Sequence, residues 1–139
     1  MKELSLKRQR TLALHDRAIR FSNNVNLSCP ERFSNIPSRR LWDQLVRAAD
    51  ATSNNLIEAD DASSDADFLN KMSIALRETK AARAELIKIR MGRLDHFQRI
   101  AERDLESEAS QLAAIFAAII RNMRLRLEEE GRSRTRRNG

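Results

Sequence analysis

Few side chains in this sequence could act as a nucleophile or as a general base. The chain of 139 residues has two histidines, one cysteine and no tyrosine. His15 precedes Asp16, and His96 follows Asp95. A neighbouring carboxylate alone is weak evidence for catalysis, because a general base must also lie within hydrogen-bond reach of the proton that it removes. The sequence therefore predicts that this protein is not an enzyme.

Metal and phosphate-loop chemistry also lack the residues that they need. A structural zinc site takes about four ligands, and the Cys and His residues here supply no such set. Five acidic residues lie between Glu58 and Asp67, but they lack the ligand order and the central glycine of a calcium loop. No glycine-rich phosphate loop is present. We therefore expect no metal and no cofactor.

One group of polar residues falls on the buried face of a predicted helix. Apolar residues recur in steps of three and four over residues 41–59, and Thr52 and Asn55 are the polar residues on that face. A buried amide without a hydrogen-bond partner costs about 1–3 kcal/mol. Asn55 is therefore expected to bond to a facing helix and to fix the register of the two helices.

Three charged residues are expected to join Asn55. Glu58 lies next to it on the helix surface, Glu78 lies on the following predicted helix, and Arg47 could supply a counter-charge. These four residues could form a polar site inside the protein, or they could tie two helices together as a structural polar core. We favour the structural polar core, because no reactive group lies nearby.

The segments that must position these residues are predicted to be helices. Three glycines and two prolines are few helix breakers for this length, and Ala, Leu, Arg and Glu are abundant. Pro30 ends the first helix, the Ser64 to Asp67 capping pattern opens the third, and Gly92 ends the third. The predicted helices span residues 6–27, 38–60, 64–92 and 104–129.

The connections between these helices are short. The sequence therefore predicts an all-α, antiparallel up-down four-helix bundle over residues 1–130. The third helix has an unbroken heptad pattern between Phe68 and Ile89. Residues 93–103 could form a short helix that covers the end of the bundle with Leu94, Phe97 and Ile100.

The fourth predicted helix has more apolar surface than one bundle face requires. All nine residues from 112 to 120 are apolar, so apolar side chains cover the full circumference of the helix. Four of them are alanines, and these small side chains tolerate exposure to solvent. The alternative is that Ile115 or Ile120 contacts another subunit.

Positive charge is concentrated near the two ends of the sequence. The net charge is +6, residues 1–40 contain nine Lys or Arg against three acidic residues, and residues 131–139 contain four arginines and no acidic residue. Residues 131–139 are predicted to be a basic disordered tail, because they contain no apolar side chain. Such a run is usually solvated charge, and binding to RNA or DNA phosphates is the alternative. The candidate nucleic-acid-binding residues are Lys7, Arg8, Arg10, Arg17, Arg20, Arg39, Arg40, Arg132, Arg134, Arg136 and Arg137.

Cysteine usage and hydropathy suggest a compartment. Cys29 is the only cysteine, so no intramolecular disulfide can form, and a reducing environment is expected. No secretory signal is visible near the N-terminus. The longest apolar run is far shorter than the roughly 20 residues that cross a bilayer. We expect a cytoplasmic protein without a membrane partner.

Three segments resemble one known family. The second predicted helix carries Gln44, Arg47, Ala48, Ala49, Asn55 and Glu58. This pattern is similar to that of the four-helix bundle protein family, which includes proteins encoded in intervening sequences of large-subunit ribosomal RNA and accessory proteins of diversity-generating retroelements. Residues 68–78 resemble the third helix of that family, and residues 108–124 resemble its last. The chain departs from the family pattern at Ala59, where a glycine is usual, and over residues 81–86.

The resemblance implies an assembly and a class of partner. Members form homopentamers, which favours contact of Ile115 or Ile120 with a neighbouring subunit. The retroelement branch implies an accessory or assembly factor that binds RNA or DNA through a basic surface, with a reverse transcriptase as a candidate partner. The alternative is a purely structural or protein-interaction oligomer of the ribosomal RNA intervening-sequence type, with no nucleic-acid role.

Overall fold

Local sequence signals set where the helices begin and end. In three helices the residue before the first turn accepts a hydrogen bond from a backbone N–H of that turn, and these caps are Ser5, Asn35 and Ser64. Cys29 precedes a proline and has an extended backbone, so the first helix ends at that point. The second helix begins two residues before the predicted position 38, because Asn35 caps it there.

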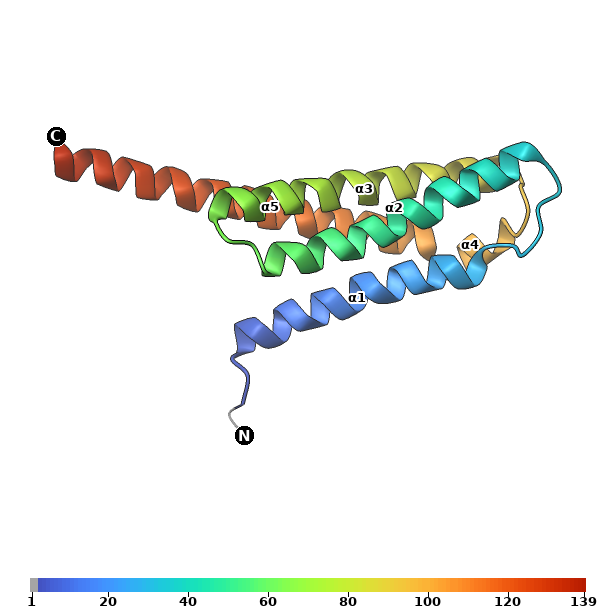
Figure 1. The fold of residues 1–139 in the computed structure, drawn as a ribbon, viewed down its shortest axis with the longest axis horizontal. Coiled ribbons are helices and arrows are strands. Elements are labelled where there is room, and N and C mark those ends of the chain that lie inside the picture. Colours follow the sequence, from blue (N-terminus) through green and yellow to red (C-terminus); the bar gives the residue numbers. More distant parts are fainter. Residues whose placement is uncertain (1–2) are drawn as a thin grey trace.

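The computed structural model describes residues 3–139, which form five helices (Figure 1). They are α1 (Leu6–Ser28), α2 (Ile36–Asp60), α3 (Asp65–Met91), α4 (Gln98–Glu102) and α5 (Leu105–Asn138). The four long helices pack antiparallel, with α2 against α1 and α3, and with α5 against α3. Residues 3–139 contain no strand. The predicted all-α, up-down four-helix bundle is confirmed.

The core lies between the long helices. The side chains of Phe21, Trp42, Leu45 and Phe116 are at most 1% exposed. The heptad pattern of α3 is also confirmed, because its later positions are buried and its first, Phe68, is half-buried against the same core. The buried heptad positions are Met72, Ala75, Thr79, Ala82, Leu86 and Ile89. Burial of these side chains is the main force that holds the helices together.

The segment between α3 and α5 covers one end of the bundle, as predicted. Leu94 and Phe97 pack against the core, and Ile100 of α4 is 1% exposed. Arg93 and His96 have φ angles of 49° and 59°, in the left-handed region. These two left-handed residues reverse the chain tightly enough for α4 to lie back over the bundle end.

α1 leaves part of its apolar surface uncovered. It packs mainly on α2 and less on α5, and Figure 1 shows its N-terminal end diverging from the other long helices. Among its large apolar side chains, Ile19 is 47% exposed and Leu27 is 55% exposed. The fold therefore offers an apolar surface on α1 that no other helix of residues 3–139 covers.

The C-terminal part of α5 extends beyond the bundle. Figure 1 shows this segment projecting past the ends of α2 and α3. The helix continues to Asn138, whereas the sequence predicted a helix to residue 129 followed by a disordered tail. Residues 128–139 are all exposed. An isolated helix of this length is marginally stable in water, so disorder of residues 131–139 in the free protein stays a prediction.

Ile120 lies in the core, which corrects its predicted place at a subunit interface. It is 5% exposed, whereas Ile115 is half-buried and packs against the edge of the core. The buried positions of α5 run through residues 105, 109, 112, 116 and 120. The step after Phe116 is four residues, because a straight helix repeats every 3.6 residues and drifts away from a strict heptad. Of the two isoleucines, Ile115 stays available as a candidate contact with another subunit.

Candidate functional site

The structure does not give Asn55 a partner on a facing helix. Its Nδ2 donates to the backbone oxygen of Ala51, one turn earlier in α2, over 2.8 Å. The side chain is half-buried, and no other side-chain hydrogen bond joins it to residues 3–139. The prediction that Asn55 fixes the register was therefore wrong, because its amide is satisfied by its own helix.

The three charged residues expected around Asn55 lie at the surface. Glu58 pairs with Lys71 over 3.0 Å, and Arg47 pairs with Asp43 over 3.2 Å along its own helix. The nearest cation to Glu78 is the neighbouring arginine at 4.0 Å. Arg47 and Glu78 do line one groove between α2 and α3, but the four residues do not form a polar core.

The buried polar contact between α2 and α3 joins two threonines instead. Thr52 and Thr79 are fully buried, and their Oγ1 atoms lie 3.2 Å apart. Each hydroxyl also reaches the carbonyl oxygen four residues earlier, that of Ala48 at 2.9 Å and that of Ala75 at 2.6 Å. Both threonines fall on the apolar stripes of the sequence, but the stripes alone did not show that they lie at the same level of the bundle.

Glu85 is a buried carboxylate that sequence reasoning missed. It is 8% exposed and lines the same groove as Arg47 and Glu78. Its Oε1 lies 3.4 Å from the Lys88 ammonium, while its Oε2 has no hydrogen-bond partner among residues 3–139. Glu85 directly precedes the buried heptad residue Leu86, and this position was the available signal. A buried, half-partnered carboxylate lowers the stability of the fold.

Asp95 anchors the start of α2 to the turn before α4. Its carboxylate accepts hydrogen bonds from the Ser34 backbone N–H at 2.7 Å and from the hydroxyls of Ser34 at 2.7 Å and Ser38 at 2.8 Å. Its carbonyl oxygen accepts from the indole N–H of Trp42 at 2.8 Å. The bonds from Ser34, followed by that from Ser38, hold the pKa of the Asp95 carboxyl below its usual value.

The remaining candidates for chemistry lie in inert surroundings. Burial, together with the charge of Asp43, raises the pKa of the Cys29 thiol, which disfavours a reactive thiolate. His15 is half-buried on α1 and makes no side-chain hydrogen bond to residues 3–139. In the described part of the chain, no group of three or more His, Cys, Asp or Glu side chains is placed to hold a metal ion. No helix of residues 3–139 is long and apolar enough to span a membrane.

Several of the predicted nucleic-acid-binding residues are engaged in ion pairs. Arg8 of α1 pairs with Asp60 of α2 over 2.6 Å, and Arg17 pairs with Glu108 of α5 over 2.6 Å. Arg20 pairs with the carboxylate four residues earlier in α1 over 3.0 Å. Arg8 and Arg17 therefore tie α1 to its neighbours, and they are less free to contact a phosphate.

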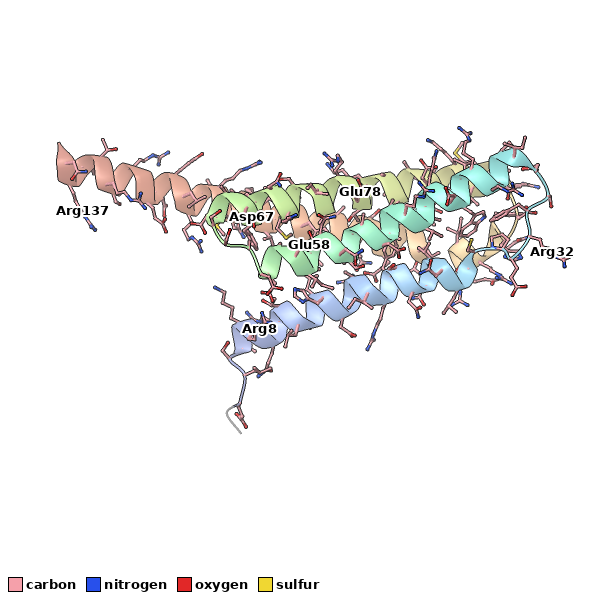
Figure 2. The ribbon with its side chains drawn as sticks, in the orientation of Figure 1. Arg8, Arg32, Glu58, Asp67, Glu78 and Arg137 are labelled. Carbon is pink, nitrogen blue, oxygen red and sulfur yellow. The ribbon has the colours of Figure 1, made fainter. Side chains whose placement is uncertain are left out.

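Most of the other predicted cations are free but are not gathered in one patch. Within residues 3–139, the following form no ion pair: Lys7, Arg10, Arg39, Arg40, Arg134, Arg136 and Arg137. Arg39 and Arg40 lie at the start of α2, and the tail arginines lie at the far end of α5. Figure 2 shows Arg137 well outside the bundle, with Arg8 near the start of α1. Arg121 and Arg124, also exposed on α5, were not predicted.

Comparison with known proteins identifies the fold. No protein-family model and no curated protein matches the sequence. Among solved structures, the chain is similar to a protein of unknown function from the S23 ribosomal protein family of Bacteroides thetaiotaomicron VPI-5482. The two share 22% identity and a TM-score of 0.65 over 80% of this chain and 97% of that chain. The bundle has the S23 family fold. At this identity the S23 similarity shows the fold alone, and the expected resemblance to a helical-bundle family is confirmed at that level.

Proposed function

We propose that this chain is a non-enzymatic, oligomeric accessory protein that binds RNA or DNA through a basic surface. The observation that carries the proposal is the overhanging end of α5, where Arg132, Arg134, Arg136 and Arg137 are all exposed. Within residues 3–139, only Arg132 of these four has an ion-pair partner, Glu128 at 3.8 Å. Unpaired guanidinium groups on a projecting arm can form bidentate contacts with phosphates.

This arm favours binding that is largely independent of sequence. It carries no aromatic side chain on which bases could stack, so phosphates are its natural contacts. Arg10, Arg39 and Arg40 of the bundle are exposed and could extend the same binding surface in an assembly of several chains. The affinity should then fall steeply with salt, because each neutralised phosphate releases condensed counterions.

A gel-shift titration with single- and double-stranded RNA and DNA tests this proposal. The titration is run at salt concentrations of roughly 50 and 200 mM. Each phosphate contact makes the slope of log affinity against log salt concentration more negative by about 0.7–0.9. Replacing the four tail arginines by glutamine should weaken binding and flatten the slope. Replacing them by lysine keeps the charge and is the matched control. If the protein binds none of these nucleic acids at the lower salt concentration, the proposal fails.

A second candidate function is a purely structural or protein-interaction oligomer. The exposed apolar side chains of α1 favour it, among them Leu12, Ile19 and Leu27. The homopentamer and the reverse transcriptase partner implied by the family resemblance remain proposals. A protein that forms an oligomer but binds no nucleic acid would favour this second function.

A further inference from the structure

Two arginines and a histidine line a hollow at the end of the bundle that α4 covers. The hollow has a volume of about 570 Å³ and lies between the C-terminal end of α1, the loop after it, and α4. Arg32 comes from the loop, His96 from the turn before α4, and Arg99 from α4 itself. Figure 2 shows Arg32 at the opposite end of the molecule from Arg137. None of these three belongs to the predicted nucleic-acid-binding set.

Contacts with the end of α1 hold two of these side chains in place. Nη1 of Arg99 donates to the carbonyl oxygens of Leu27 at 3.4 Å and Ser28 at 3.5 Å. Nδ1 of His96 lies 3.2 Å from the Ser28 oxygen. Since a carbonyl oxygen only accepts, Nδ1 is the donor, and Nε2 is the ring nitrogen left for another partner. Both side chains are therefore positioned by weak contacts that leave most of their polar atoms unused.

Arg32 is the third side chain of the hollow and is free, and the backbone of His96 across the hollow has an unusual conformation. Arg32 forms no ion pair and no side-chain hydrogen bond with residues 3–139. His96 has a φ of 59°, a conformation that a residue with a side chain adopts only when its surroundings impose it. Glu31 is the one acidic residue that lines the hollow in the described part of the chain. Two guanidinium groups and an imidazole thus face a single carboxylate.

We propose that this hollow binds a phosphate dianion, either inorganic phosphate or a terminal phosphate monoester. A guanidinium group presents paired N–H donors that match two phosphate oxygens, and two such groups from different segments can hold one dianion. In the protonated ring, Nε2 of His96 can donate to a third oxygen. The phosphate can come from free phosphate or from the terminal phosphate of a nucleic acid, and the chemistry of recognition is the same. This site is separate from the arm of α5, and it stands or falls independently of the function proposed above.

Calorimetric titration of the full chain with inorganic phosphate tests the site directly. At about pH 8 phosphate is a dianion, and we expect saturable binding with a Kd on the order of 1 mM. Arg32→Gln removes a side chain without structural contacts, so this variant should fold normally and bind roughly tenfold more weakly. Arg99→Gln should have a similar effect, with thermal unfolding as a check, because Arg99 also contacts α1.

Two further variants separate a site from general charge attraction. Glu31→Gln removes the one carboxylate that lines the hollow among residues 3–139 and should tighten binding several-fold. Arg103→Gln removes an exposed arginine near the end of α4 that does not line the hollow, and it should leave the Kd unchanged. No saturable binding to the unmodified chain, or an equal loss with Arg103→Gln and Arg32→Gln, would overturn the proposal.

A pair of RNA oligonucleotides distinguishes the sources of the phosphate. If a nucleic-acid end occupies the hollow, a 5′-phosphorylated strand should bind more tightly than its 5′-hydroxyl counterpart, and Arg32→Gln should remove that difference. If free phosphate binds but the two strands bind equally, the hollow takes the small anion. Failure of the α5 arm to bind RNA would leave the phosphate titration unaffected, so the two proposals can fail separately.

Discussion

Asp95 connects the turn before α4 to the loop before α2 and to α2 itself. It accepts three hydrogen bonds from Ser34 and Ser38 and fixes the first turn of α2 against the turn before α4. The sequence marked Asp95 only as a neighbour of His96. Its hydrogen-bonding partners lie 57 and 61 residues away along the chain, so no local pattern could identify its role.

Replacing Asp95 by asparagine should lower the melting temperature by several degrees at neutral pH. The carboxylate is bonded in the folded state, and its pKa is depressed there, so its contribution is complete above the ordinary aspartate pKa of 3.8. It is lost as the pH falls through the lower folded value. Thermal unfolding of both proteins from pH 7 to pH 2 should therefore show the difference shrinking at the acidic end. Asp61→Asn, at an exposed helix end, is the control.

Glu85 gives a prediction of the opposite sign. Its Oε2 atom is buried without a partner among residues 3–139, and its ammonium partner on Lys88 is 60% exposed. Glu85→Met keeps the volume and removes the buried charge, so the free energy of unfolding should rise by roughly 1–3 kcal/mol. Lys88→Met removes only the ammonium partner and should lower the free energy of unfolding. Denaturant unfolding measures both changes, and a destabilised Glu85→Met would mean that this carboxylate has a role in the fold that its contacts do not show.

Asn55 and the two threonines show where residue-scale prediction stops. The apolar stripe correctly placed Thr52 on the buried face of α2, but it could not show which polar side chain of that face contacts α3. A helical residue can satisfy its own polar atoms on the preceding turn, as Asn55 does with Ala51. Thr52 reaches Thr79 because of the axial register of α2 and α3, and that register depends on the packing of both helices along their whole length.

At the scale of elements, the signals that worked were local. Caps, a proline and the heptad of α3 predicted four long helices and the short covering segment, with most ends within about two residues, which is the usual uncertainty of helix ends. The predicted end of α5 was wrong by nine residues, because Gly131 does not interrupt the helix, which continues to Asn138. All side chains beyond residue 127 are exposed, so no packing against the bundle defines where this helix must stop.

The overhang of α5 should exchange its amide hydrogens much faster than the rest of the helix. Residues 131–138 make no tertiary contact that would protect them, whereas Leu112 and Phe116 are fully buried. Hydrogen exchange followed by mass spectrometry should show full exchange of the overhang within seconds and protection of residues 109–120. Deleting residues 131–139 should leave the melting temperature within about a degree, as for other changes at solvated surface. Strong protection of the overhang would indicate that it packs against another chain.

At the scale of the whole molecule, the sequence predicted the bundle but not the placement of its charge. The order and spacing of the helices leave few topologies, and the up-down arrangement follows from short connections. The pairing of Arg8 with Asp60 and of Arg17 with Glu108 depends instead on the angle at which α1 lies across the bundle. The cations without ion pairs therefore lie at opposite ends of the protein. Assembly of several chains could bring such cations from different subunits close together.

We expect the protein to be an oligomer in dilute solution, because α1 exposes large apolar side chains and Ile115 lies only half-buried on α5. Ile115→Asp should then dissociate the assembly while the helical circular dichroism is retained. Ile120→Asp should instead unfold the protein, because Ile120 lies in the core. Ile36→Asp, at an 81% exposed position far from Ile115 in sequence, should change neither.

Light scattering on a size-exclusion column measures the mass of each protein. Circular dichroism then distinguishes dissociation of a folded Ile115→Asp variant from unfolding of the Ile120→Asp variant. A mass near 16.0 kDa for the unmodified protein at micromolar concentration would contradict self-assembly and leave the apolar surface of α1 for a different protein. If the oligomer persists in the Ile115→Asp variant, the interface between subunits does not lie at this face of α5. The exposed side chains Leu12 and Ile19 lie one heptad apart on one face of α1, so α1 would then be the interface helix, and Ile19→Asp should dissociate the assembly.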